Sequence, residues 1–409
     1  MKILMINKFF YRRGGSEAYM FDLIDLLKKE GQQIIEFSMQ DEKNLPSKFA
    51  DYFVKNINFS KREGWLKDLK KAFHLLYSYE AKKKLETLIK KEKPDIAHLH
   101  NFNFQITPAI LSVLKKHKIP VIWTMHDYHL ICPNYRLFTQ GKVCERCKIN
   151  KFYNCYKYKC IKNSRTMSFL AMLEMYLHKI LLRSYEKIDL FISPSKFLAA
   201  KVQAWGIRPE KIKQLYNFVN LEEFKLADEI GEDLIYFGRL AEEKGLLFLL
   251  EAMKDLKDIN LKLVGDGLQK IEIKNFIAAN NLSNVKLLGH KSGQELYNLI
   301  KNSRMVVLPS IWYENNPLVI LEAFALAKPV IGSNLGGIPE LIETAKTGFI
   351  FQAGNENELK SIIKDNYSRI ELIQNMGING RKYVELNCSP KAHYQQLLQI
   401  YQSLITQGF

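Results

Sequence analysis

Two carboxylates accompany an apolar run at residues 312–331, WYENNPLVILEAFALAKPVI. Glu314 precedes the run, and Glu322 lies inside it eight positions later. The run predicts a helix with Asn316 as its N-cap and Pro317 in its first turn, where a missing N–H costs nothing. Glu322 is then either an edge-of-core residue or one of two carboxylates that face something polar bound above the helix N-terminus.

A pair of cations follows the strand predicted near 234–238, in the stretch FGRLAEEKGLLFLLEAM. Arg239 comes directly after the strand, and Lys244 stands at the start of the next helix. A planar guanidinium and a point charge beside a helix N-terminus make a site for a diphosphate. The alternative is a solvated loop in which Glu242 and Glu243 neutralise both cations.

Glycine turns at three other strand ends could bring the backbone close to a ligand. In YRRGGSEAY, Gly14 and Gly15 precede a helix that Ser16 can cap, and the N–H groups there favour an anion. VGDG and LLGH place Gly265 and Gly289 at strand ends, where a nucleotide base could lie against the backbone. Simple turns are the alternative at each of these positions.

The elements that must position these residues alternate between short Val/Ile/Leu runs and longer amphipathic segments. This alternation predicts an α/β protein with two doubly wound parallel sheets, whose strands are apolar on both faces. In such sheets ligands bind beyond the carboxyl ends of the strands, and the cleft between two such domains is the natural site. The predicted strands are 2–7, 33–38, 95–99, 120–125 and 189–193 in the first half, and 234–238, 260–264, 284–288, 304–308, 328–332 and 347–351 in the second.

Two domains are expected because 409 residues exceed what one ordinary core accommodates. We predict an N-terminal Rossmann-like domain over 1–216 with a cysteine-rich insert at 132–160, and a C-terminal Rossmann-like domain over 217–387. A final helix within 388–409 can cross back to the N-terminal domain. The start MKILMINKFF is too short and too soon polar for a signal peptide, and no apolar run approaches the roughly 20 residues of a membrane span. A cytoplasmic location is expected.

The positive charge is concentrated in the first half of the chain. The net charge is +17; residues 1–215 carry 40 basic and 20 acidic side chains, whereas 216–409 carry 20 and 23. The asymmetry favours an anionic partner, namely a nucleic acid, an acidic lipid surface or a phosphorylated acceptor, and a solvated lysine-rich surface is the alternative. Segment 60–93 predicts a basic amphipathic helix that lies on an anionic membrane surface or uses its apolar residues in the core. The next apolar helix, 167–182, is interpreted as core.

Five of the six cysteines fall within residues 132–160. In a cytosolic protein such clustering favours a metal over disulfides. Cys144, Cys147, Cys155 and Cys160 could supply a four-thiolate structural zinc site, with a spacing more compressed than in common zinc ribbons. Free thiols, with an occasional disulfide, are the alternative.

Several short motifs follow one another along the chain. In order they are GGSE, HD at 126–127, GRLAEEKG, the pair Glu314 and Glu322, and GGIPE, with PDIAHLHN, DLFISPSKFL and NFVN between them. In this order they resemble family 4 of the glycosyltransferases, the "glycosyl transferases group 1" type, over nearly the whole chain. The resemblance implies a GT-B fold, in which two Rossmann-like domains face each other across a cleft. It also implies an enzyme that takes a nucleotide sugar and retains anomeric configuration.

The resemblance assigns roles to individual residues. Arg239 and Lys244 would hold the donor diphosphate, and Glu322 would accept hydrogen bonds from the ribose hydroxyls. Glu314 would lie near the transferred sugar, and His126 would face that sugar from the N-terminal domain. We treat these two residues and the two cations as catalytic through positioning and electrostatics, and we assign no nucleophile. The implied donor-binding residues are Gly15, Arg239, Lys244, Gly265, Gly289, Glu314, Pro317, Leu318, Val319 and Glu322, and the acceptor-side residues are Arg13, Gly14, Ser16, His126 and Asp127.

The chemistry requires charge stabilisation of a leaving nucleoside diphosphate. No D-x-D occurs in the sequence, so Arg239, Lys244 and a helix N-terminus are expected to act without a metal or other cofactor. We expect transfer of a hexosyl or N-acetylhexosaminyl group from a UDP- or GDP-sugar to a glycan or lipid-diphosphate-linked acceptor in cell-envelope polysaccharide biosynthesis. The enzyme would be peripheral to the inner face of the membrane. His98 and His100, at a strand end, are interpreted as structural more than as cleft-lining.

Two alternatives stay open at this level. A sugar-nucleotide epimerase of the same fold would form product from the donor alone, without an acceptor. A basic nucleic-acid-binding protein would account for the basic half and the cysteines but leaves the second-domain motifs unexplained, so no nucleic-acid partner is expected.

Overall fold

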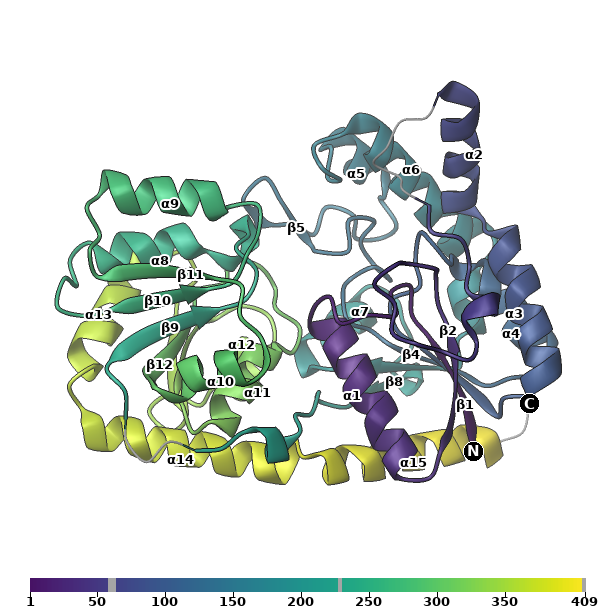
Figure 1. Cartoon of the computed structure of the whole chain (residues 1–409). Coiled ribbons are helices and arrows are strands. Elements are labelled where there is room, and N and C mark those ends of the chain that lie inside the picture. The colour runs from purple at the N-terminus through teal and green to yellow at the C-terminus, as the bar shows by residue number, and fades with distance from the viewer. Residues whose placement is uncertain (58–63, 227–229, 407–409) are drawn as a thin grey trace. The chain divides into compact units, whose positions relative to one another are not determined.

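The computed structural model describes residues 1–57, 64–226 and 230–406, and for residues 65–67 it describes only the backbone. The chain forms two compact units, each built on its own six-stranded sheet (Figure 1). Unit 1 comprises Met1–Thr139, Glu145–Leu215 and Tyr394–Phe409, and unit 2 comprises Gln140–Cys144 and Tyr216–His393. The predicted α/β class with two parallel sheets is confirmed.

The sheet of unit 1 has the strand order β2-β1-β3-β4-β7-β8, and all neighbouring strands are parallel. The central strands consist mainly of branched apolar residues and are buried along their length, as expected for a sheet covered by helices on both faces. The order reverses direction between β1 and β3, which makes the carboxyl ends of these two strands a topological switch point. The strands are β1 (Lys2–Ile6), β2 (Gln33–Phe37), β3 (Ile96–Leu99), β4 (Val121–Thr124), β7 (Leu190–Ser193) and β8 (Ile212–Gln214).

The helices of unit 1 begin and end at recognisable residues. Ser78 caps α3 by accepting a hydrogen bond from the Ala81 N–H at 3.2 Å, and Lys93 ends the helix in the left-handed conformation. Ser195 caps α7 in the same way through the Leu198 N–H. The helices are α1 (Gly15–Lys29), α2 (Trp65–Leu76), α3 (Tyr79–Glu92), α4 (Leu111–Lys116), α5 (Tyr153–Lys157), α6 (Arg165–Met175), α7 (Lys196–Ala204) and α15 (Pro390–Thr406), which belongs to unit 1 from Tyr394 onward.

The sheet of unit 2 has the order β11-β10-β9-β12-β13-β14, again parallel throughout. In chain order this is 3-2-1-4-5-6, so the switch point lies between β9 and β12. The strands are β9 (Asp233–Phe237), β10 (Leu261–Val264), β11 (Val285–Gly289), β12 (Ser303–Leu308), β13 (Val330–Ser333) and β14 (Gly348–Phe351). The helices are α8 (Leu246–Met253), α9 (Lys270–Ala279), α10 (Gly293–Lys301), α11 (Leu318–Ala325), α12 (Ile338–Leu341), α13 (Glu356–Asn366) and α14 (Ile370–Asn387).

Each strand predicted from the sequence is present, with its ends shifted by at most about two residues. The sequence prediction omitted β8, which has only three residues, and the two-residue strands β5 (Phe138–Thr139) and β6 (Lys142–Val143). Strands this short carry too few residues for an apolar period to be recognised.

Candidate functional site

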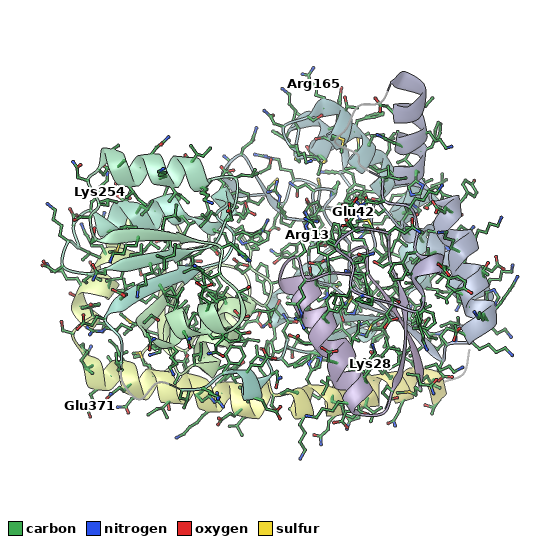
Figure 2. The ribbon with its side chains drawn as sticks, viewed as in Figure 1. Arg13, Lys28, Glu42, Arg165, Lys254 and Glu371 are labelled. Atoms are coloured by element: carbon green, nitrogen blue, oxygen red, sulfur yellow. The ribbon has the colours of Figure 1, made fainter. Side chains whose placement is uncertain are left out.

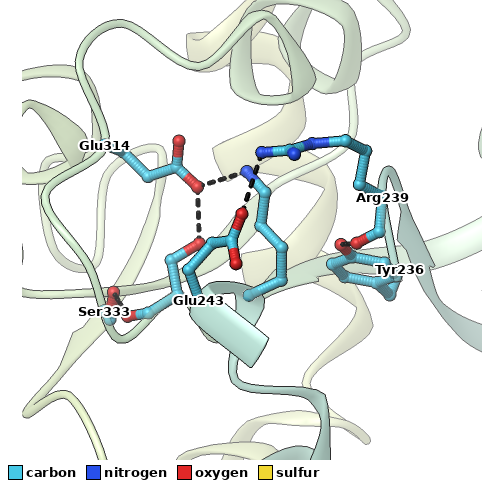
Figure 3. Close-up of polar contacts among 7 residues, drawn as sticks. Tyr236, Arg239, Glu243, Glu314 and Ser333 are labelled. Atoms are coloured by element: carbon cyan, nitrogen blue, oxygen red, sulfur yellow. Dashed lines mark hydrogen bonds and ion pairs between the residues drawn. The ribbon is translucent and has the colours of Figure 1, made fainter. Parts of the chain in front are cut away.

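Charged side chains gather at the switch point of unit 2. Arg239 and Lys244 follow β9, and Glu314 follows β12, which is the hydrogen-bonded neighbour of β9. Because parallel strands end at the same edge of the sheet, the two loops meet although the sequence separates them. The structure therefore brings together the cations and one of the two carboxylates singled out from the sequence (Figure 3).

Lys244 and Glu314 form a buried ion pair. The Lys244 Nζ donates to Glu314 Oε1 at 2.6 Å, and the Ser310 Oγ donates to the same oxygen at 2.6 Å (Figure 3). Burial by itself raises the pKa of the Glu314 carboxyl, but the Lys244 ammonium and the hydrogen bonds outweigh this effect, so the pKa lies below its ordinary value. Ser333 supports the arrangement by donating to the Ser310 carbonyl at 2.6 Å. The carboxylate is thus ionised and held at the edge of the sheet.

Arg239 has a different environment from Lys244. Its side chain is 64% exposed, and its Nη2 donates to the buried carboxylate of Glu243 at 3.0 Å. The sequence alternative in which Glu242 and Glu243 neutralise both cations therefore holds only for Arg239 and Glu243. A guanidinium has five N–H donors, so one carboxylate contact leaves others for a phosphate.

The helix α11 starts one residue later than predicted. Pro317 occupies the N-cap position, and α11 begins at Leu318, so the predicted N-cap role of Asn316 is wrong. The Asn316 Oδ1 instead accepts a hydrogen bond from the Asn217 backbone N–H at 3.1 Å. This bond holds the segment that leads into unit 2. The N–H groups of Leu318 and Val319 lie in the first turn, where the helix leaves its donors without intrahelical acceptors. Glu322 is half-buried in the second turn of α11.

Two of the glycine turns are required by close backbone packing. Gly336 has φ +66°, and a Cβ there would lie 2.1 Å from the backbone oxygen of Glu314. Gly265 has φ +149°, and a Cβ there would lie 1.8 Å from the backbone oxygen of Gly238. Gly289 ends β11 with open space around it. The glycine at 265 therefore has a structural reason for its identity that is independent of any ligand.

The first loop of unit 1 differs from its prediction in one respect. The helix α1 begins at Gly15 with Gly14 as its N-cap, so Ser16 lies in the first turn and does not cap it. The Ser16 Oγ instead accepts from Asn101 Nδ2 at 2.9 Å, which links α1 to the loop after β3. The Arg13 guanidinium lies over the ring of Phe9, and the Asp127 carboxylate accepts the His129 backbone N–H at 2.9 Å.

A network of buried aromatic and hydroxyl side chains surrounds His126 in unit 1. His98, on β3, has its Nδ1 2.6 Å from the Tyr401 hydroxyl of α15 and its Nε2 2.7 Å from the Thr124 Oγ1. His100, just beyond β3, has its Nδ1 2.8 Å from the Nε2 of His126, and their rings stack with centroids 5.2 Å apart. Sequence reasoning treated His98 and His100 as structural, and only the spacing of two histidines at a strand end hinted at this network.

The same surroundings keep the imidazoles of His100 and His126 neutral. His126 is partly exposed, but the groups packed around its ring desolvate it and lower its pKa to about 3. Burial, with the neighbouring His98 and His126, holds the pKa of His100 well below its usual range. Tyr19 of α1 packs edge-on against His126, with ring centroids 5.3 Å apart. His126 is therefore a neutral hydrogen-bonding group at physiological pH and not a cation.

The predicted four-thiolate zinc site is not assembled. Among the residues that the structure describes, no three His, Cys, Asp or Glu side chains gather in a way that could hold a metal ion. Cys144, Cys147, Cys155 and Cys160 form no disulfide in the part of the chain that the structure describes. The buried Cys155 thiol, on α5, donates to Cys160, and this hydrogen bond is the main reason that the pKa of Cys160 is lowered to about 7.

Residues 60–63 of the basic amphipathic segment 60–93 lie outside the described residues, and the rest of the segment forms α2 and α3 in place of one helix, with a break at Tyr77 and Ser78. On α2, Leu69 and Phe73 are 49% and 62% exposed, while the side chains of residues 65–67 lie outside the described part. The helix predicted as core at 167–182 is α6, which packs beside α2 and continues into a π-helical turn, Tyr176–Leu181. That prediction was wrong in part, because Phe169, Ile180 and Leu181 are exposed.

Two family models together match most of the chain, residues 13–383. A model described as Glycosyltransferase Family 4 matches residues 13–223, and a model described as Glycosyl transferases group 1 matches residues 220–383. The uncharacterized glycosyltransferase MJ1178 of Methanocaldococcus jannaschii is 26% identical over 389 residues, spanning 94% of this chain and 93% of that protein.

Solved structures agree in fold. The sucrose-phosphate synthase of Thermosynechococcus elongatus has a TM-score of 0.73 at 18% identity and covers 99% of both chains. Anabaena Alr3699/HepE in complex with UDP and glucose has a TM-score of 0.70 at 19% identity and covers 98% of this chain and 100% of that one. At these identities the likeness establishes the shared architecture. The Glycosyltransferase Family 4 model matches more than half of this chain, and the chain has two parallel Rossmann-like sheets. The chain therefore belongs to glycosyltransferase family 4 and has the GT-B fold.

Proposed function

We propose that this glycosyltransferase moves a hexosyl or N-acetylhexosaminyl group from a UDP- or GDP-sugar to a glycan or lipid-linked acceptor, with retention of configuration, during cell-envelope polysaccharide synthesis. The observation that carries the proposal is the joining of Arg239, Lys244 and Glu314 at the switch point of unit 2. UDP in the HepE complexes supports the nucleotide class, and relatives described as amylovoran and colanic acid biosynthesis glycosyltransferases support the pathway class.

The donor would bind with its diphosphate at the loop after β9. Arg239 is exposed and keeps donors for a phosphate, whereas Lys244 is already paired with Glu314. Lys244 can donate a further hydrogen bond to a phosphate because an ammonium has three N–H donors. The first-turn N–H groups of α11 add positive potential beside them. Glu322, one turn further along α11, is suited to accept from two ribose hydroxyls.

Departure of a nucleoside diphosphate builds negative charge on its bridging oxygen. We propose that Arg239, Lys244 and the α11 N-terminus stabilise this charge without a metal, since preorganised cations and dipoles act where charge develops. Glu314 would hold Lys244 in place and lie near the transferred sugar. We propose that Arg13, Gly14, Ser16, His126 and Asp127 contact the acceptor and the transferred sugar.

A lipid-linked acceptor is supported by the surface of α2 and α6. Exposed Leu69, Phe73 and Phe169 lie on these packed helices, and Leu181, in the following turn, is 75% exposed. Basic side chains flank them, and Arg165 at the start of α6 projects outward (Figure 2). None of the described helices is both long enough and apolar enough to cross a bilayer. We propose a peripheral contact with the inner face of an anionic membrane.

Ligand binding tests the donor site. Saturation-transfer NMR and calorimetry against UDP-, GDP-, ADP- and dTDP-sugars should show selective binding of one donor. Glu322→Ala and Arg239→Gln should each weaken it by about 10-fold or more, as expected for a lost charge-assisted hydrogen bond. Glu371→Ala and Lys274→Gln, exposed positions on α14 and α9, serve as matched controls and should leave affinity unchanged.

The reaction itself separates the remaining classes. Donor consumption that depends on an added glycan or lipid-linked acceptor supports transfer. Product formed from the donor alone would favour an epimerase of the same fold, and binding of none of the four donors would contradict the proposal.

A further inference from the structure

The hydrogen bond between His100 and His126 has two possible directions, and they give His126 different chemistry. Both rings are neutral, so each carries one N–H and one bare nitrogen. If the His100 Nδ1–H donates, the Nε2 of His126 accepts and its proton lies on Nδ1. If the His126 Nε2–H donates, the His100 Nδ1 accepts and the His100 proton must lie on Nε2.

The surroundings of His100 distinguish these two states. His100 is fully buried, and its Nε2 has no hydrogen-bond partner among the described residues. In the second state this buried nitrogen would carry an N–H without an acceptor, whereas in the first state it keeps only a bare lone pair. Buried donors are left unpaired more rarely than buried acceptors. A free imidazole slightly favours the Nε2–H form, but that preference is smaller than the cost of an orphaned buried donor.

The neighbours of His100 prevent its ring from rotating to give the buried Nε2 a hydrogen-bond partner. Its ring stacks on His98 with centroids 4.5 Å apart and on His126 with centroids 5.2 Å apart. His98 is itself held at both nitrogens, by the hydroxyls of Tyr401 and Thr124. The ring of Tyr19 packs against both His100 and His126. The stack therefore presents the His100 Nδ1 to His126 in one orientation.

We infer that His100 is a positioning residue that donates to His126 and fixes it in the Nδ1–H tautomer, so that His126 offers a hydrogen-bond donor and no base to its ligand. No other hydrogen bond of the His126 ring is formed among the described residues, and the residue is only half-buried, so its second nitrogen is left for a ligand. Under the proposed function, on which the identity of the ligand rests, that ligand is a sugar hydroxyl or ring oxygen, which can accept from an N–H.

The tautomer can be measured without any substrate. Long-range ¹H–¹⁵N NMR of the full chain labelled at its nine histidines, with the His126 signal assigned from a His126→Gln variant, reports which nitrogen carries the proton. We expect Nδ1–H for His126 and for His100 in the wild type. An Nε2–H signal for His126 would overturn the inference, whether or not the protein binds a nucleotide sugar.

Two variants of His100 separate positioning from packing. His100→Asn keeps an N–H donor near the position of Nδ1, whereas His100→Leu fills the space without a donor. We expect His100→Leu to return His126 toward the Nε2–H form and to lower kcat/KM for sugar transfer by about 10-fold, and His100→Asn to recover most of that loss. Equal activity of the two variants, at equal melting temperatures, would contradict the positioning role. If the wild type transfers no sugar, the proposed function fails while the NMR result still decides the tautomer.

Discussion

The Lys244 ammonium and the Glu314 carboxylate, 70 residues apart in the chain, form a buried ion pair at 2.6 Å that joins the loop after β9 to the loop after β12. These loops follow the two strands on either side of the switch point of unit 2. The pair therefore organises the donor site before any ligand arrives. It also means that reversing the charges of Arg239 and Lys244 together would place a carboxylate at position 244 beside the carboxylate of Glu314.

A cleaner test of the pair uses Lys244→Met. Removing the ammonium leaves the Glu314 carboxylate buried and unpaired, so we expect the free energy of unfolding of unit 2 to fall by about 3–5 kcal/mol. Urea denaturation followed by circular dichroism measures this. The double variant Lys244→Met/Glu314→Leu removes both charges and should recover much of the loss; a double variant no more stable than Lys244→Met would show that the pair is not the cause.

The ionised state of Glu314 predicts a pH dependence of stability. Its pKa in the folded protein lies below the ordinary value of 4.5, so its contribution is fully present above about pH 4.5 and is lost as the pH falls through the folded value. We expect Glu314→Gln to be less stable than the wild type by a constant amount from pH 5 to 7, and the difference to shrink on further acidification. Chemical denaturation at stepped pH checks this, and a difference that grows in acid would contradict it.

The turn at Gly336 should tolerate no side chain. Gly336→Ala and Gly354→Ala both place an alanine at positive φ, +66° and +78°, but only the first brings a Cβ to 2.1 Å from a backbone oxygen, that of Glu314. The second meets nothing closer than 3.9 Å. We expect Gly336→Ala to destabilise the protein by about 1–3 kcal/mol more than its control, because backbone must move. Thermal unfolding of the two variants under one condition measures the difference.

The C-terminal helix should depend on one hydroxyl. Tyr401→Phe leaves the buried Nδ1 of His98 without its partner at 2.6 Å, which predicts a loss of about 1–3 kcal/mol. Tyr394→Phe on the same helix removes only a part-buried contact with Gln32 and should cost less. Hydrogen exchange of α15 and β3 amides would reveal the loosening, and similar exchange rates in both variants would argue against the His98 anchor.

The membrane contact predicts a surface variant with a selective effect. Leu181→Asp places a charge on the apolar surface of unit 1, so we expect binding to vesicles of mixed anionic and neutral lipid to fall at least several-fold without loss of folding. Leu268→Asp is the matched control, because Leu268 is 99% exposed but belongs to unit 2. Co-sedimentation with vesicles measures the binding. Equal losses in both variants, or none in either, would count against this surface.

The sequence by itself determined the architecture and the residue types of the site. Buried parallel strands are continuous runs of branched apolar residues, so the alternation of such runs with amphipathic segments was enough to predict both sheets. Arg239, Lys244, Glu314 and Glu322 could be singled out because they sit in the loop and helix that follow such strands. The family motifs then supplied their roles.

Only the tertiary structure decided which of these residues meet. Lys244 pairs with Glu314 and not with its neighbour Glu242, because the sheet order places β9 beside β12. Asn316 and Ser16 do not cap helices as predicted, because their side chains accept hydrogen bonds from Asn217 and Asn101 of other segments. The stack of His98, His100 and His126 joins the ends of β3 and β4 and is anchored from α15, some 300 residues away. Such contacts depend on which strands and helices become neighbours in space. A local pattern of residues does not predict these neighbours.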